Sequence, residues 1–372
     1  MTEDRYGRSM RACSPSPLRA SVEPDDRLRR RLFKPSTWHG RSSTRAGAAL
    51  SLCAFAALAP ARAAAQDDIS PQLKTNYGEH ETARSAGLSG AMRALGNGTT
   101  AVLMNPADMV ATRVYHIEAL AQLTPEAARQ VYGGVIVDSM TGRLAGGIAF
   151  FGGFIDPEGI NRSFIDARLA LAFPITERLF IGLTGRYAKI TQSGDYEPLT
   201  GSRASRGLVD PDAEASIPPE RSPFYDGFTF DAGLTVKATD SLHLAVLGQN
   251  LSYPNTGAVP TSIGGGIGYG TSDLSIEVDA IADFNSYTST SARVMAGAEL
   301  LLGDHFPLRA GYKFDGGASV HAISAGLGYI HTDFSVEASV HRTLSDPGAT
   351  TIVIGLAYFL ESASLGRAAG LD

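Results

Sequence analysis

Apolar and polar side chains alternate along most of the chain after residue 112. In the segment FTFDAGLTVKA, residues 228–238, every second residue is apolar or small, and the residues between them are polar, charged or glycine. Successive side chains of a β-strand point to opposite faces, so this alternation predicts a strand with one apolar and one polar face. The question is what each face contacts.

The same alternation recurs in many segments, which turn sequences such as DPEG, ATDS and GTSD separate. Together they predict fourteen strands. These strands are 113–122, 130–138, 144–151, 163–173, 179–190, 228–238, 242–251, 260–269, 274–282, 292–301, 308–314, 318–329, 334–341 and 350–360. Because no helix-period segment interrupts the series, it favours an antiparallel meander over a parallel α/β sheet.

The strand number is even and the connections are uneven in length, as is typical of a bacterial transmembrane barrel. One connection, residues 191–225, is long and rich in Pro, Gly, Ser and charged residues, and we expect it to form an external cap. We therefore predict an all-β fold, in which residues 113–360 form an antiparallel transmembrane β-barrel of about 14 strands. A short C-terminal tail, residues 361–372, follows it.

Two environments explain a clean apolar face. A soluble periplasmic sandwich would bury it against a second sheet, whereas a barrel would turn it toward lipid. The opposite face gathers charges of both signs, and in hydrocarbon only a closed barrel pairs all backbone polar groups of its strands. We therefore expect lipid outside and a polar lumen inside. The residues predicted to line a pathway through the lumen are Asp166, Arg168, Arg186, Asp231, Lys237, Glu277, Asp279, Arg309, Lys313 and Glu337.

Aromatic residues near the ends of the predicted strands favour the same interpretation, because such residues form girdles at membrane interfaces. They are Tyr115, Phe173, Phe180, Tyr269, Phe306, Tyr312, Tyr329, Tyr358 and Phe359.

Residues 1–65 are predicted to be a leader that ends in a secretory signal peptide. The apolar run 46–61 follows Arg41 and Arg45 and is succeeded by small residues, which is the pattern of a cleaved signal. We place cleavage near Ala65, with Ala63 as the alternative. The basic stretch RRRLF, residues 29–33, resembles a twin-arginine signal only in part, and a basic leader is the simpler interpretation.

Removal of the leader changes both the cysteine content and the charge. Cys13 and Cys53 both lie in the leader, so disulfides and thiol chemistry are not expected in the remainder. The leader also holds 12 of the 32 basic and 5 of the 38 acidic residues, which leaves 20 basic and 33 acidic residues and a net charge of −13. This balance excludes nucleic acid as a partner, because phosphate binding needs clustered positive charge.

Residues 66–112 differ from the strand region because they are rich in Ala and Gly. Two helices are predicted, 83–95 and 99–110, with the break GNG between them. In the sequence NPA, residues 105–107, Asn105 is expected to cap a turn or helix that Pro106 opens.

The stretch SAGLSGAMRALGNGTTAVLMNPADM, residues 85–109, resembles the start of outer-membrane long-chain fatty-acid transporters of the FadL type and of the related PorV-type barrels. The matching residues are Gly87, Leu88, Asn105, Pro106 and Ala107. GQNL, PTSIGGGIGY and LRAGYKFD, further along the chain, are also similar. The resemblance implies that residues 66–112 form a hatch folded inside the barrel, although Asp108 departs from the usual Gly or apolar residue.

The resemblance also implies a function: passage of small hydrophobic, fatty-acid-like molecules across a bacterial outer membrane. Lipid, a small hydrophobic ligand and, during biogenesis, the barrel assembly machinery are the partners it implies. No motif for fatty-acid contacts is present. The alternative is a scaffold or shuttle for secreted proteins, as PorV-type members are.

No catalytic or cofactor motif emerges, so we expect neither an enzyme nor a bound cofactor or metal. HETAR, residues 80–84, lacks the spacing of a zinc protease. The glycines of GGGIGYG, residues 264–270, are better explained as a strand with a small-residue face that the hatch approaches. The acidic run DPDAEA, residues 210–215, is interpreted as a solvated loop rather than a calcium site. A barrel enzyme using Ser and His remains the third alternative.

Overall fold

The computed structural model describes residues 80–155, 162–192, 223–254, 259–286, 290–344 and 348–360. The predicted leader, the predicted C-terminal tail, most of the 191–225 connection and the acidic run at 210–215 lie outside this part of the chain.

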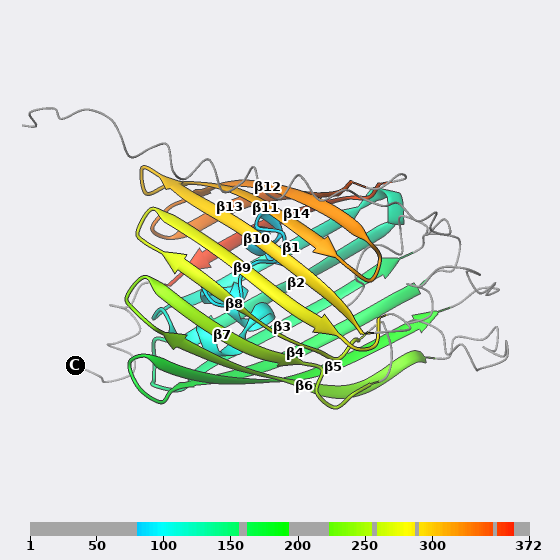
Figure 1. The fold of residues 1–372 in the computed structure, drawn as a ribbon, viewed down its shortest axis with the longest axis horizontal. Helices are drawn as coiled ribbons and strands as arrows, with labels where there is room; N and C mark the ends of the chain where they lie inside the picture. The colour runs from blue at the N-terminus through cyan, green and yellow to red at the C-terminus, as the bar shows by residue number, and fades with distance from the viewer. Residues whose placement is uncertain are drawn as a thin grey trace, which may run out of the picture. The chain divides into compact units, whose positions relative to one another are not determined.

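Fourteen antiparallel strands close into a barrel, in which each strand pairs with its sequence neighbours and β1 pairs with β14 (Figure 1). The strands are β1 Tyr115–Thr124, β2 Arg129–Asp138, β3 Ala145–Ile155, β4 Arg162–Pro174, β5 Leu179–Gln192, β6 Pro223–Lys237, β7 Leu242–Gln249, β8 Ser262–Gly270, β9 Leu274–Asp283, β10 Ser291–Leu302, β11 Phe306–Asp315, β12 Val320–Ile330, β13 Phe334–Thr343 and β14 Thr350–Phe359. A short 3-10 helix, η4 (Pro125–Ala127), joins β1 to β2. The predicted fold class and strand number are confirmed, and the closed barrel excludes a sandwich.

Strand β6 answers the question that its sequence raises. Phe228 is 78% exposed on the outside of the barrel, whereas Asp231 is 4% exposed and faces inward. Leu169, Val278 and Val336 continue the exposed apolar surface on other strands. An apolar exterior with a hidden polar face is the arrangement expected of a barrel in lipid.

The two ends of the barrel differ in their connections. At the end where β1 begins and β14 ends, here called the terminal end, the turns are three to six residues long. At the opposite end the connections range from 4 residues to the 30 residues of 193–222. Short turns on one side and long loops on the other are characteristic of outer-membrane barrels.

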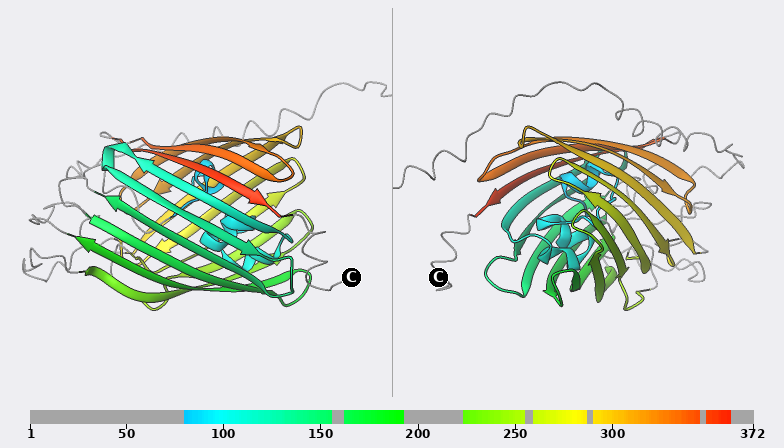
Figure 2. Two further views of the ribbon diagram at one scale, coloured as in Figure 1. Left: turned by 180° about the vertical axis from the view of Figure 1, so that it is seen from behind. Right: turned by 60° about the vertical axis from the view of Figure 1, so that its left-hand side comes forward.

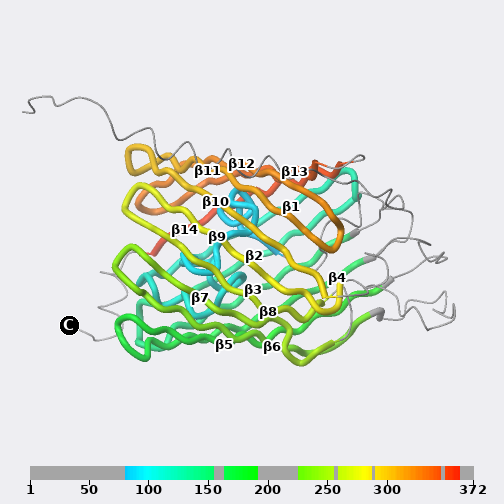
Figure 3. The backbone as a smooth tube through the Cα atoms, in the orientation of Figure 1, coloured from blue at the N-terminus to red at the C-terminus, as the bar shows by residue number. Residues whose placement is uncertain are grey.

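Residues 80–112, here called the inner segment, lie within the ring of strands (Figures 2 and 3). They comprise α1 (Ala83–Gly87), α2 (Gly98–Met104) and the 3-10 helix η3 (Pro106–Val110), whose residues are almost all buried. The remainder of the predicted hatch, residues 66–79, lies outside the described residues. None of the helices described here has the length and hydropathy that a membrane crossing requires.

The inner helices are shorter than predicted. The first ends at Gly87 rather than at residue 95, because Ser89 and Gly90 adopt left-handed conformations, with φ of 54° and 83°, that turn the chain. The second is divided at Asn105, which is extended because the following proline disfavours helical backbone before it. The predicted cap is confirmed: the Asn105 side chain accepts a hydrogen bond from the Ala107 amide, and Pro106 begins η3.

Two residues of the predicted aromatic girdle face inward. Phe180 is buried under the ammonium group of Lys237, which lies 5.1 Å from its ring centroid. Phe359 contacts the His116 ring, with centroids 4.3 Å apart and the ring planes tilted by 40°, and lines an internal cavity at the terminal end. Their positions at strand ends were correctly interpreted, but a strand end does not reveal which face a residue occupies. Phe173, Tyr269, Phe306, Tyr329 and Tyr358 are exposed on the outside, as predicted.

The lumen contains an apolar region in addition to the polar face that was expected. Inward-facing apolar residues of β2 to β5 form one cluster with α2 and η3, next to the inward-facing charged residues Asp166, Arg168 and Arg186. Members of this cluster include Val131, Val135, Phe151, Phe164, Ala170, Val102 and Met109. Further inward-facing acids and arginines lie on β9, β10, β11 and β13, among them Glu277, Asp279, Arg293, Arg309 and Glu337. Strand β2 is apolar on both faces, so alternation alone did not identify its lumen side.

Candidate functional site in the barrel lumen

Inward-facing glycines make room for the inner segment. A Cβ atom on Gly182 would lie 2.8 Å from the Pro106 carbonyl oxygen, and one on Gly297 would lie 2.7 Å from the Leu88 Cβ. Gly268 on β8 is covered in the same way by Leu95, as expected for a small-residue face beneath the hatch. Since only glycine lacks a Cβ, these positions allow the inner segment to contact the wall backbone closely.

Asn105 fixes the turn between α2 and η3 to the wall. It is fully buried, and its side-chain nitrogen donates to the Arg93 carbonyl at 2.7 Å and to the Thr235 hydroxyl on β6 at 2.9 Å. Its side-chain oxygen meanwhile caps η3. One amide group thus joins three parts of the chain, which explains why this residue type suits the position.

Two carboxylates of β9 hold the stretch that follows α1. Glu277 accepts hydrogen bonds from the amides of Ala94 and Leu95, at 2.5 and 2.9 Å. Asp279 accepts from the Arg93 amide at 3.3 Å and pairs with the Arg93 guanidinium at 3.1 Å. Both acids therefore anchor the inner segment rather than face an open channel.

Serine hydroxyls attach the α1 region to β12 and β13. The hydroxyls of Ser89 and Ser324 lie 2.8 Å apart, and Ser324 also donates to the Gly87 carbonyl. Ser339 donates to the Ala83 carbonyl at 2.5 Å. Together with the close approach of Leu88 to Gly297, these contacts define where the first matching residues of the family motif, Gly87 and Leu88, dock.

A buried ionic cluster lies around Asp166 on β4. Its carboxylate pairs with Arg168 at 2.9 Å and Arg186 at 2.5 Å, and His80 lies 3.4 Å away. The His80 ring stacks on Phe151 and Phe164, with centroids 4.6 and 5.3 Å apart. Burial lowers the pKa of His80 to about 4, so the ring is neutral at neutral pH.

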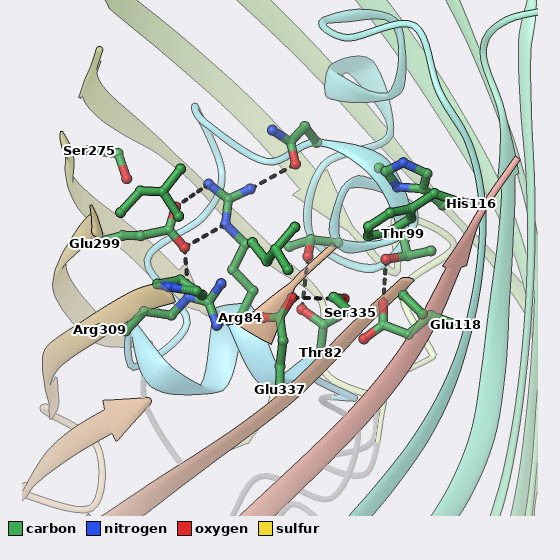
Figure 4. A pocket seen from close by; sticks show the side chains of 18 of the residues that line it. Thr82, Arg84, Thr99, His116, Glu118, Ser275, Glu299, Arg309, Ser335 and Glu337 are labelled. Carbon is green, nitrogen blue, oxygen red and sulfur yellow. Dashed lines mark hydrogen bonds and ion pairs between the residues drawn. The ribbon is translucent and has the colours of Figure 1, made fainter. Parts of the chain in front are cut away.

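A cavity of about 410 Å³ lies at the terminal end, between the inner segment and the wall (Figure 4). Arg84 of α1 projects into it and pairs with Glu299 of β10 at 2.7 Å. Arg309 of β11 bridges Glu299 and Glu337 at 2.6 and 2.5 Å. On the other side of the cavity, Thr99 donates to Glu118 of β1. The rim includes the β8–β9 turn and Phe359, so the cavity lies at the barrel mouth.

The predicted pathway residues are inward-facing in most cases, but they do not line one continuous channel. Asp166, Arg168, Lys237, Glu277 and Asp279 contact the inner segment directly. Asp231 instead accepts the Asn250 amide at 2.7 Å and holds the turn after β7. Only Arg309 and Glu337 line the cavity at the terminal end. Lys313 lies on β11 with an intermediate exposure.

Sequence reasoning assigned no lumen role to His80, Arg84, Arg93 or Glu118. The signal available was a set of charged residues in an Ala/Gly-rich segment that was expected to be enclosed. A charge buried there needs a partner of opposite sign on the wall, which would have linked Arg84 and Arg93 to inward-facing acids. Register was not available from sequence, so the partners were not identifiable.

Within the described ranges, no group of three His, Cys, Asp or Glu side chains is placed to hold a metal ion. The acidic run considered for calcium, residues 210–215, lies outside those ranges.

The chain is similar in structure to solved transport barrels. The monoaromatic hydrocarbon channel CymD superposes with a TM-score of 0.53 at 14% identity, covering 74% of this chain and 96% of that one. The Pseudomonas putida toluene transporter TodX superposes with a TM-score of 0.53 at 13% sequence identity, covering 77% of this chain and 99% of TodX. A Pseudomonas aeruginosa FadL homologue superposes with a TM-score of 0.52 at 12% sequence identity, covering 75% of this chain and 98% of the homologue.

No protein-family model matches the sequence, and a search of curated proteins finds no match either. At such low identity the structural likeness concerns the fold alone. The chain shares the barrel fold of these hydrocarbon transporters and of the FadL homologue, which is the fold that its N-terminal motif predicted.

Proposed function

We propose that this protein is a bacterial outer-membrane barrel that admits small hydrophobic molecules, with the inner segment acting as a hatch. The observation that carries the proposal is the division of the lumen. Inward-facing apolar residues of β2 to β5 form one cluster with the inner segment, while polar side chains of the wall, such as Glu277 and Thr235, hold that segment across the barrel. An apolar wall lowers the free energy of a hydrophobic solute relative to water.

The exterior supports the location in a membrane. Large apolar side chains are exposed on the outside of nearly every strand, and soluble monomers rarely expose contiguous apolar surface of this extent to water. Lipid is therefore the partner of the outer face. The likeness in fold to barrels described as hydrocarbon and toluene transporters agrees with this interpretation.

The predicted pathway residues take a revised role in this proposal. Half of them, Asp166, Arg168, Lys237, Glu277 and Asp279, contact the hatch, so passage requires that some of these contacts break. Arg309 and Glu337 line the cavity at the terminal end and lie on the route of exit. The barrel assembly machinery is proposed to insert the chain, as it does other barrels of the outer membrane. Catalysis forms no part of the proposal.

Uptake of radiolabelled toluene by whole cells tests the function. The protein is produced in the outer membrane of a bacterium that lacks its own hydrophobic-compound transporters, and initial rates are compared with cells that carry an unrelated barrel at equal level. We expect several times faster uptake with the protein present. Equal rates, combined with co-purification of a secreted protein in stable complex, would instead support the scaffold alternative.

A further inference from the structure

The cavity at the terminal end has a charge balance that selects among ligands. We propose that it binds the uncharged hydrogen-bonding group of a small apolar ligand and rejects carboxylates. The inference rests on the proposed function in one respect: a molecule leaving through the terminal end passes this cavity. The proposal states which chemical class of ligand the cavity binds, and the barrel fold alone does not determine that class.

Carboxylates outnumber cations in the cavity. Two arginines, Arg84 and Arg309, face four acids, which are Glu118, Asp273, Glu299 and Glu337. Among the described residues, neither Glu118 nor Asp273 takes part in an ion pair. A ligand carboxylate placed here would therefore meet more negative than positive charge, and this disfavours its ionised form.

Both arginines are already occupied. The Nε and Nη2 atoms of Arg84 donate to Glu299 at 3.0 and 2.7 Å, and its Nη1 donates to Asn97 at 2.7 Å. Arg309 donates to Glu299 and Glu337. Tight recognition of a carboxylate uses the two parallel N–H groups of a guanidinium. In this cavity, protein carboxylates already hold those groups.

The rest of the lining suits an uncharged ligand. The Ser275 hydroxyl offers a donor and an acceptor, the hydroxyls of Thr82 and Thr100 bond each other at 2.8 Å, and Leu301, Ile330 and Phe359 supply apolar surface. A mostly apolar body with one hydroxyl or carbonyl group matches such a mixed lining. A carboxylate of the same shape gains no more contacts and adds repulsion, which is how sites discriminate against a related ligand.

Benzyl alcohol and benzoate form a matched pair of probes, because they share the ring and differ in the charged group. Equilibrium dialysis with the purified full chain at pH 8 measures both affinities. We expect benzyl alcohol to bind at least about ten times more tightly than benzoate, a ratio that corresponds to about 1.4 kcal/mol. Glu118→Gln keeps the shape of the side chain and removes one negative charge. We therefore expect it to reduce the preference for benzyl alcohol over benzoate by about tenfold.

Two further variants locate the effect. Ser275→Phe fills the cavity from β9, and we expect it to abolish binding of benzyl alcohol. Asp240→Asn removes a charge from the β6–β7 turn, at the same end but outside the cavity, and we expect the ratio to stay unchanged. Equal affinities for the two probes, absence of binding by both, or an unchanged ratio in Glu118→Gln would overturn the inference. Selective binding without any toluene uptake would refute the proposed function alone.

Discussion

Replacing Gly182 with valine is expected to open the barrel to ions. Gly182 faces inward on β5, and a Cβ at this position would overlap the backbone of Pro106 and Ala107. Backbone atoms have no rotamers to relieve such overlap, so the inner segment must move away from the wall. Overpacking of this kind costs about 1–3 kcal/mol, which raises the undocked population about 5- to 150-fold.

Conductance of the purified variant in planar lipid bilayers measures this opening. The matched control is Gly185→Val on the same strand, because Gly185 is exposed on the outside and a Cβ there meets almost nothing. We expect frequent open events for Gly182→Val and a closed baseline for Gly185→Val and the unaltered protein. Identical baselines in all three would show that the inner segment does not close the barrel at this point.

Replacing Leu169 with arginine is expected to destabilise the barrel strongly in a bilayer. Leu169 is 57% exposed on the outside, near the middle of the 13-residue strand β4. At the centre of the hydrocarbon layer an arginine on the lipid face costs about 2–4 kcal/mol, and near the interface about 0–1 kcal/mol. The free-energy cost of the arginine therefore depends on its depth in the membrane rather than on its exposed fraction.

Leu144→Arg is the control for depth. Leu144 is 56% exposed but lies in the turn before β3 at the terminal end. Denaturant titration of both variants in lipid vesicles gives the free energies of unfolding. We expect Leu169→Arg to lower the free energy of unfolding by about 2 kcal/mol or more beyond the decrease caused by Leu144→Arg. Equal losses would mean that the outer face of β4 does not lie in hydrocarbon.

The wall was predictable because alternation and turn residues are local signals. Strands β4, β6 and β9 alternate cleanly; the limits of β4 and β9 agree with the predicted ranges within one residue, and β6 begins five residues earlier than predicted. Closure followed from a physical constraint: open strand edges are not tolerated in lipid. The connection pattern needed no tertiary information either, since its long and short members alternate along the sequence.

The interior was less predictable, because it depends on register between residues far apart in the chain. Arg84 and Glu299 are 215 positions apart, and Asn105 and Thr235 are 130 apart. The charged residues of the inward face were identified, but their contacts with the inner segment were not. Inward-facing glycines at Gly182, Gly233, Gly297 and Gly311 gave a signal that went unused: several small residues on the lumen side indicate a closely packed insert.

Hydrophobic molecules are expected to pass only when the inner segment moves, and a reversible disulfide tests this requirement most directly. The chain has no cysteine after Cys53. In the variant Ser89→Cys/Ser324→Cys, the thiols replace hydroxyls 2.8 Å apart, within reach of a disulfide, and join the inner segment to β12. The control, Thr124→Cys/Thr351→Cys, replaces hydroxyls at the same 2.8 Å separation but joins only β1 to β14.

Toluene uptake is measured in cells carrying each double variant, first oxidised and then treated with a reductant. We predict that oxidation stops uptake through the Ser89→Cys/Ser324→Cys barrel, that reduction restores it, and that the control passes toluene equally in both states. Uptake that continues undiminished with the inner segment locked to β12 would contradict the account.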